Sequence, residues 1–144
     1  MEESLFPFMD PQEVVAGETE TELPLAKEWA WDFERCDFKT KNGKMYIVEG
    51  NEAIKIWIWK IFQTPRYRYL IYSWDYGNEL EELIGKGSQS FIKSEAERLV
   101  KEAIWPTLNG YVEDIKNLEI DFKDDILIIS FTAITPYGEA RINV

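Results

Sequence analysis

The stretch Leu118–Val144, LEIDFKDDILIISFTAITPYGEARINV, decides the fold. In its first part, apolar and charged residues alternate, which is typical of a strand with one buried face. The next part, Ile126–Ile134, is apolar on both faces, so it predicts a central strand that is covered on both sides. Turn residues separate the strands at Asp124-Asp125 and at Pro136-Tyr137-Gly138. A third strand completes an antiparallel meander, and its apolar residues are Ala140, Ile142 and Val144.

Two helices are predicted upstream of this meander. Residues 52–63 carry apolar side chains three and four positions apart, with Asn51 as the predicted N-cap. Thr64-Pro65 predicts the end of this helix, because the residue before a proline avoids the helical region. The second helix is predicted over residues 90–104, from a Ser90 cap to Trp105-Pro106. The side chains expected to face the core are Ala53, Ile54, Trp57, Ile58 and Ile61 in the first helix and Ile92, Ala96, Leu99, Val100 and Ala103 in the second.

Ile56 and Trp59 fall on the charged side of the first predicted helix. In one interpretation, another part of the same domain covers them. In the other, they form a partner-binding face, because tryptophan is enriched at binding hot spots. The sequence leaves both interpretations open.

A hairpin is predicted before the first helix. Trp29–Phe38 alternates with a period of two, Lys41-Asn42-Gly43-Lys44 is a turn signal, and Met45–Val48 is a second short strand. The whole pattern predicts an α+β domain over residues 29–144. Its antiparallel sheet combines this N-terminal hairpin with the C-terminal three-stranded meander and packs against two main helices.

Residues 1–28 are predicted to form an extended acidic N-terminal arm. The first 26 residues carry seven acidic and no basic side chains, whereas the rest of the chain carries 20 acidic and 16 basic ones. Such a segment is either a disordered tail or an arm that docks on a partner. The second interpretation explains why the arm contains the apolar cluster Leu5, Phe6, Phe8 and Met9.

Composition excludes several functions. A net charge of −11 argues against nucleic acid and anionic membranes as partners, since both attract Lys and Arg. The chain has no His, so Ser-His and Cys-His catalysis and His-bound metals are excluded, and the single Cys36 leaves no internal disulfide. We therefore expect no cofactor and no metal. No membrane span or signal peptide is apparent, which predicts a soluble protein made in a reducing cytoplasm.

The segment 66–76 is dense in Tyr, Trp and Arg. Arginine with aromatic residues is also a composition that stacks on single-stranded nucleic acid, but the acidic background disfavours that interpretation. Asp75 lies between Trp74 and Tyr76, where desolvation would raise a carboxyl pKa. It is therefore the candidate residue for an alternative function, a carboxylate-based glycosidase acting on the cell wall. A second alternative is a protein-binding module of the host that acts through the Trp59 face.

The segment Asn51–Lys86, NEAIKIWIWKIFQTPRYRYLIYSWDYGNELEELIGK, carries a family resemblance. It resembles the XkdS-type baseplate proteins of contractile phages and phage-derived tail particles. These are distant relatives of the baseplate wedge protein W and of the sheath-initiating wedge component of other contractile systems, including type VI secretion. The resemblance covers roughly residues 29–144 and includes the closing Ile129-Ser130-Phe131-Thr132 and Tyr137-Gly138-Glu139.

The resemblance implies a structural role without catalysis. Relatives sit at the top of the baseplate, contact a bundle of wedge proteins through an arginine loop, and exchange strands with the first sheath ring. The resemblance implies other wedge proteins and the tail sheath protein as partners, with tail hub or tube proteins as further candidates. It also implies a location on the virion tail baseplate after assembly in the host cytoplasm. In this chain the wedge-binding positions are Arg66, Tyr67, Arg68, Trp74, Tyr76 and Gly77, and the strand-exchange positions are Ala140, Ile142 and Val144. The relatives have an acidic residue before the arginine where this chain has Pro65. This difference leaves three alternatives: Arg66 takes the arginine's role, Arg68 takes it, or neither does.

Overall fold

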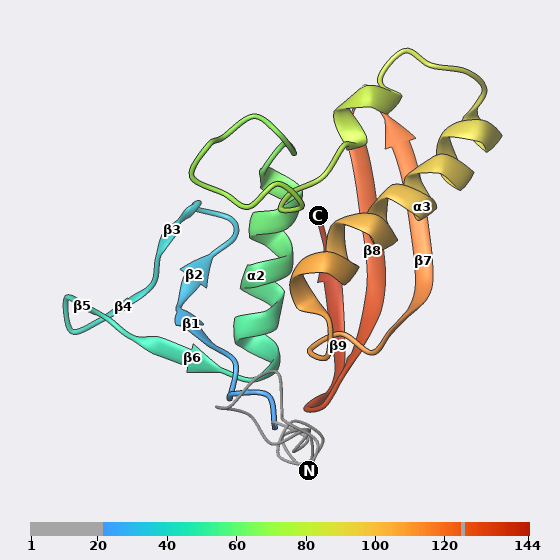
Figure 1. Cartoon of the computed structure of the whole chain (residues 1–144). Coiled ribbons are helices and arrows are strands. Elements are labelled where there is room, and N and C mark those ends of the chain that lie inside the picture. The colour runs from blue at the N-terminus through green and yellow to red at the C-terminus, as the bar shows by residue number, and fades with distance from the viewer. Residues whose placement is uncertain (1–21, 125) are drawn as a thin grey trace, which may run out of the picture.

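The computed structural model describes residues 22–124 and 126–144. Figure 1 shows three parts: short N-terminal strands, the helix α2 (Asn51–Gln63) beside them, and a three-stranded sheet crossed by the longer helix α3 (Gln89–Leu108). A short 3-10 helix, η1 (Leu80–Leu83), packs against α3. One hydrophobic core joins both helices to the sheet. The predicted α+β class is confirmed, whereas most of the predicted acidic arm lies outside the described residues.

The C-terminal sheet is the predicted meander. Its strands are antiparallel in the order β7 (Asp114–Lys123), β8 (Ile126–Thr135) and β9 (Gly138–Asn143). Ile129 and Phe131 of β8 are buried under the helices. The prediction that β8 is covered on both sides is wrong for the described residues, because Ile126 and Ile128 on the other face are 62% and 45% exposed. Both helices pack on one face, and no described element covers the other.

Helix α2 presents the predicted apolar face to the core. Its buried residues include Ala53, Ile54, Ile58 and Ile61, and Trp57 is partly buried against the same cluster. The N-cap is Gly50 rather than the predicted Asn51. The Asn51 side chain instead reaches the sheet, where its Oδ1 accepts a bond of 2.5 Å from the Thr135 hydroxyl. The predicted stop is confirmed, since Thr64 is the C-cap in an extended conformation.

The second helix is longer than predicted. Helix α3 begins at Gln89 with Ser88 as its N-cap, so the prediction of Ser90 as the cap is wrong. At its other end it continues through Pro106 to Leu108. A proline removes one backbone donor and clashes with the preceding turn, so a helix that continues through it must satisfy the orphaned carbonyl by other means. The side chain that does so comes from the loop after α2 and is described below.

The N-terminal region consists of three small two-stranded sheets rather than one hairpin with long arms. Its strands are β1 (Lys27–Trp29), β2 (Trp31–Asp32), β3 (Asp37–Phe38), β4 (Thr40–Lys41), β5 (Lys44–Met45) and β6 (Ile47–Glu49), paired β1–β6, β2–β3 and β4–β5.

The prediction of a continuous strand over residues 29–38 is wrong because the chain reverses after Asp32. The Asp32 carboxylate accepts hydrogen bonds of 3.0 Å from the amides of Glu34 and Arg35, which makes an Asx-type turn. The predicted turn at Asn42-Gly43 is confirmed, with positive φ at both positions.

Candidate partner-binding site

The loop Pro65–Gly77, between α2 and η1, is closed at its base by a pair of backbone hydrogen bonds. The Arg66 amide donates to the Asn78 carbonyl at 2.8 Å, and the Asn78 amide donates to the Thr64 carbonyl at 3.0 Å. Loops with such closely spaced ends are compact units that carry exposed functional side chains. We call Thr64, Arg66, Gly77 and Asn78 the neck of this loop.

Gly77 permits the close approach of the two chain segments in the neck. Its φ is +105°, and a Cβ at this position would lie 2.5 Å from the Thr64 carbonyl oxygen. Only glycine fits such a position without strain. The resemblance had implied a wedge-binding role for Gly77, and the structure places it buried in the neck.

Asn78 caps the C-terminal end of α2. Its buried side-chain amide donates to the carbonyls of Ile61 at 2.9 Å, Phe62 at 2.8 Å and Thr64 at 3.1 Å. These carbonyls belong to the last turn and the C-cap of a helix, where most carbonyls lack an i+4 amide donor. The sequence analysis did not identify Asn78. The carbonyls that it caps lie 14 to 17 positions upstream, and no local sequence pattern connects them to Asn78.

Arg66 completes helix α3 rather than facing a partner. Its Nη2 donates a 3.0 Å bond to the carbonyl of Glu102. Glu102 lies four residues before Pro106, so its carbonyl is the one that loses its helical donor to the proline. The Arg66 side chain is only 9% exposed, and its Nη1 lies 3.6 Å from the Glu79 carboxylate. A buried guanidinium therefore replaces the missing backbone donor and fastens the loop to α3.

Arg68 is the arginine that remains at the surface. Its side chain is 56% exposed and forms a 2.9 Å ion pair with the equally exposed Glu81. Exposed pairs of this kind contribute little to stability and are readily exchanged for another partner. The structure thus distinguishes the two arginines that the sequence left as alternatives: the Arg66 side chain is buried against α3, and the Arg68 side chain is exposed.

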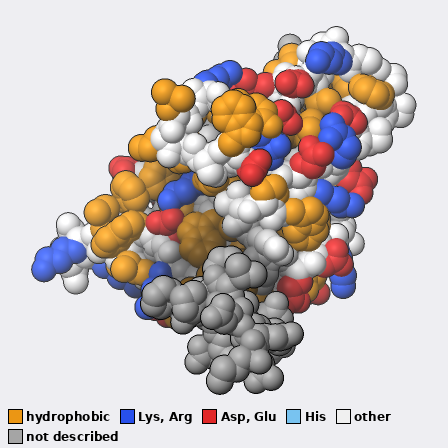
Figure 2. All heavy atoms as spheres, in the orientation of Figure 1, with side chains coloured by type: hydrophobic (Ala, Val, Ile, Leu, Met, Phe, Trp, Pro, Cys, Tyr) orange, Lys and Arg blue, Asp and Glu red, His pale blue; other side chains and the backbone are white. Residues whose placement is uncertain are grey.

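The far end of the loop carries large apolar side chains in solvent. Leu70 is fully exposed, and Ile71 and Trp74 are 87% and 73% exposed. We call these three residues the tip, and Figure 2 shows hydrophobic side chains projecting over this loop. Contiguous exposed apolar residues on a soluble domain usually mark an interaction surface.

Aromatic pairs stiffen the loop between neck and tip. The rings of Tyr67 and Trp74 lie 4.9 Å apart, and Tyr72 stacks on Tyr76 at 4.7 Å. Burial, together with the neighbouring Tyr72 and Glu28, raises the pKa of Tyr76 to about 12. Tyr67 has a positive φ of 64°, a conformation that ring packing compensates. A loop held in this way loses little conformational entropy when it binds.

Ile56 and Trp59 are covered by the N-terminal strands. Ile56 is buried, and the Trp59 ring packs at 5.3 Å from Trp31 and 5.9 Å from Phe33. Of the two interpretations that the sequence left open, coverage by the same domain is therefore the one that the geometry favours. The Trp31 indole Nε1 in this cluster has no hydrogen-bond partner among the described residues.

The outer edge of β9 is open. Ile129 and Val144 exchange two backbone hydrogen bonds of 2.8 Å. Because such pairs alternate along an antiparallel ladder, the register makes Ala140 and Ile142 bond to β8 as well. The backbone groups of Glu139, Arg141 and Asn143 then point outward, and no described strand pairs with them. The Glu139 carbonyl accepts a 3.4 Å bond from the Asn51 side-chain amide, which leaves Arg141 and Asn143 as the positions that no described group occupies.

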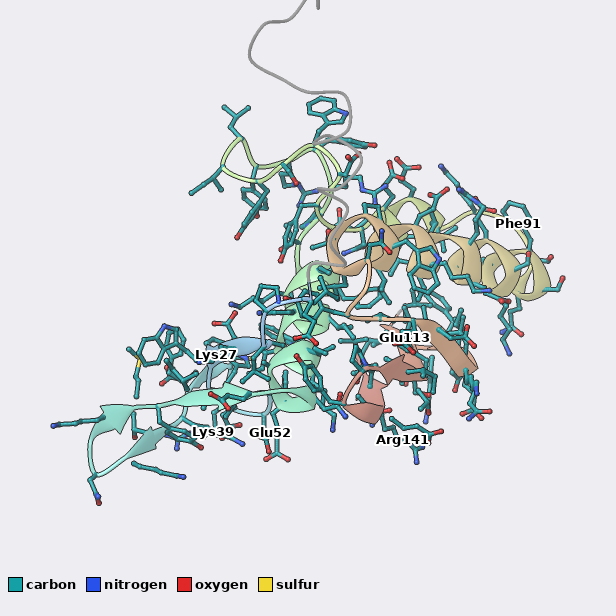
Figure 3. The ribbon with its side chains drawn as sticks, turned by 60° about the horizontal axis from the view of Figure 1, so that its bottom comes forward. Lys27, Lys39, Glu52, Phe91, Glu113 and Arg141 are labelled. Carbon is teal, nitrogen blue, oxygen red and sulfur yellow. The ribbon has the colours of Figure 1, made fainter. Side chains whose placement is uncertain are left out.

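This alternation changes how the predicted strand-exchange residues are understood. The side chains of Ala140 and Ile142 are buried in the core and Val144 packs against it, so these three residues anchor β9. The outward groups belong to the residues between them. Figure 3 shows Arg141 projecting from β9 on the side away from both helices.

The two edges of the sheet are not equivalent. The pairing of β7 with β8 is interrupted between Lys116 and Glu119, and Asn117 within this bulge has a φ of 54°. Bulges twist an edge strand and block further pairing. Strand β9 has an uninterrupted register from Gly138 to Asn143. Of the two edge strands of this sheet, β9 is therefore the one whose described register is regular along its whole length.

Comparison with known proteins identifies the family. The family model described as the contractile injection system sheath initiator matches residues 27–138. The chain belongs to this sheath initiator family. The protein XkdS of the phage-like element PBSX from Bacillus subtilis (strain 168) is 29% identical over 110 residues, which are 75% of this chain and 77% of that protein. The predicted resemblance is confirmed, and this sheath initiator is a structural component of a contractile phage tail.

The site suggested for a glycosidase has no special environment in this sheath initiator. Asp75 is solvent-exposed in the loop, so the burial that the hypothesis required does not act on it. Residues 22–124 and 126–144 contain no group of three or more His, Cys, Asp or Glu side chains placed to hold a metal ion. In the same part of the chain, no helix is both long and apolar enough to cross a membrane.

Proposed function

We propose that this sheath initiator joins a baseplate wedge to the tail and templates the first sheath ring by strand addition, and that it does so without catalysis. The observation that carries the proposal is the regular, unpaired outer edge of β9. Unpaired N–H and C=O groups on an edge strand pair with an incoming strand of another chain. The expected partners are the tail sheath protein at this edge and other wedge proteins at the loop.

The arrangement of β9 suits it to a template. Its inward-facing groups are fixed by β8 and its apolar side chains lie in the core, so adding a strand does not require β9 to move. The outward groups of Arg141 and Asn143 are spaced two residues apart along one edge, beyond the Glu139 carbonyl that Asn51 occupies. A partner strand would find two sites with a preformed geometry, and its own register would be set by them.

We assign the wedge contact to the tip of the loop together with Arg68. The neck holds the tip in place, and Leu70, Ile71 and Trp74 are the most exposed large apolar side chains of the loop. Buried aromatic and aliphatic anchors supply most of the free energy of binding at protein interfaces. Arg68 can leave Glu81 for an acidic group on the partner at little cost.

Proline substitution in β9 tests whether its outer edge templates the sheath. In Arg141→Pro the lost N–H faces outward, and edge strands tolerate proline at such positions, so we expect the domain to fold. Particles assembled with this variant should have baseplates and tubes but far fewer sheaths in electron micrographs. The matched control Arg141→Ala changes the side chain and keeps the N–H, so it should assemble sheaths normally.

A second proline variant, at another outward position, controls for misfolding of the first. Asn143→Pro removes another outward N–H and should give the same loss of sheaths. Its circular-dichroism spectrum should match that of the natural protein, which would show that the variant is folded. Normal sheath assembly by both folded proline variants would disprove strand addition at β9. Finding the protein away from the sheath–baseplate junction in cryo-microscopy of whole particles would disprove the wider proposal.

A further inference from the structure

A groove of about 630 Å³ lies between α2, the C-terminal end of α3 and the loop after α2. Five aromatic side chains line it: Trp57, Trp59, Tyr72, Tyr76 and Tyr111. Its size and its mainly apolar walls are those of sites that bind apolar groups. Neither the strand edge nor the tip makes use of it.

The floor of the groove is held in shape by Glu28 of β1. One carboxylate oxygen accepts a 3.1 Å bond from the Trp57 indole and a 2.6 Å bond from Lys60. Burial alone would raise the pKa of Glu28, but these bonds, with one from the Trp29 amide, lower it below its ordinary value. The only cation among the lining residues is therefore neutralised, so the groove favours an apolar occupant over an acidic one.

The described chain begins at the rim of this groove. The Tyr111 hydroxyl, on the groove wall, donates a 2.8 Å bond to the Pro24 carbonyl. Leu23 packs against Gly110, where an added Cβ would lie 2.6 Å from its Cδ1. Residues 1–21 precede this fixed point, so they are attached beside the groove.

These preceding residues contain an apolar cluster within reach. Leu5, Phe6, Phe8 and Met9 lie in an otherwise acidic segment, and Met9 is 14 residues from the fixed Leu23. A chain of 14 residues spans up to about 45 Å when extended and averages about 20 Å as a flexible coil. Attachment beside the site gives the cluster a high effective concentration there. The neighbouring Glu and Asp side chains would remain in solvent.

We propose that the groove binds the Leu5–Met9 segment of the same chain. The phenyl groups of Phe6 and Phe8 fill the space between the aromatic walls. Pro7 between them restricts the backbone and lowers the entropy lost on docking. The proposal is independent of strand addition at β9, since it concerns a different surface.

Disulfide trapping in the full-length chain tests this docking. In a Cys36→Ser background, Asp10→Cys beside the cluster is combined with Thr107→Cys, an exposed residue of the groove. The matched control combines Asp10→Cys with Glu113→Cys, which is also exposed and is as far from Gly110 in sequence as Thr107 is. We expect the Thr107 pair to form an intramolecular disulfide about tenfold faster than the control pair.

The apolar side chains supply a second comparison. Adding Phe6→Ser and Phe8→Ser to the Thr107 pair should slow the reaction to the rate of the control, while Val14→Ser and Val15→Ser should leave it fast. Equal rates for the Thr107 and Glu113 pairs, or no effect of the phenylalanine changes, would overturn the proposal. Disulfide-linked dimers in place of the intramolecular product would also overturn it, in favour of docking on a second copy.

Discussion

The neck and the tip of the loop Pro65–Gly77 lie a few residues apart in sequence and have opposite physical characters. The neck is buried, and its polar groups are committed to α2 and α3 through Asn78 and Arg66. The tip exposes Leu70, Ile71 and Trp74, of which Trp74 packs on Tyr67. The comparison shows that a dense aromatic and arginine-rich segment is not a single site. Arg66 is bonded to α3, whereas Leu70, Ile71 and Trp74 are exposed to solvent.

Gly77→Ala should cause the largest loss of stability, because it combines a positive φ with a collision in the neck. We expect the free energy of unfolding to fall by about 3 kcal/mol in urea titrations. Gly85→Ala is the matched control: its φ is also positive, at +76°, but a Cβ there has open space. The control should lose only about 1 kcal/mol. Equal losses would show that the close approach in the neck is unimportant.

Asn78→Ala should be the next most damaging change. It removes the side-chain donor of three hydrogen bonds to the end of α2, at a cost of about 2 kcal/mol. The Thr64 and Ile61 carbonyls keep a backbone donor, so the Phe62 carbonyl is the one most affected. Gln63→Ala removes an exposed amide side chain at the end of the same helix and should change stability by less than about 0.5 kcal/mol. If the two variants unfold at the same urea concentration, Asn78 is not the cap of α2.

A double-mutant cycle measures the link between Arg66 and Pro106. Arg66→Ala alone should lose about 1.5 kcal/mol, because the Glu102 carbonyl then has no donor. In a Pro106→Ala background the helix supplies its own N–H at position 106, and the same arginine change should cost only about 0.5 kcal/mol. Identical costs in both backgrounds would mean that Arg66 acts independently of the proline.

Changes at the tip should have the smallest effect on stability and the clearest effect on assembly. Leu70→Ser with Ile71→Ser replaces two exposed side chains, so the free energy of unfolding should change by less than about 0.5 kcal/mol. Incorporation of the protein into baseplates, measured by immunoblotting of purified particles, should nevertheless fall strongly. Full incorporation of this variant would remove the tip from the proposed wedge contact.

Much of the fold followed from local patterns. The meander, its central strand, the two helices and the Asn42-Gly43 turn each rest on a periodicity or on a turn signal that neighbouring residues carry by themselves. The failures also had local causes. The Asp32 turn broke a strand whose alternation looked continuous, and a glycine rather than Asn51 occupied the N-cap of α2.

The roles of individual residues in the candidate site were decided by contacts between distant segments. The sequence alone marked both arginines, the exposed aromatics and the last strand, and it indicated the family. It could not distinguish the role of Arg66 from that of Arg68. The distinction depends on the Glu102 carbonyl, which lacks a helical donor because of Pro106 and lies 36 residues beyond Arg66. Nor could the sequence show which backbone groups of β9 point outward, because that depends on the register between β9 and β8. Periodicity is a property of neighbours along the chain, whereas hydrogen-bond partners and exposure are properties of neighbours in space.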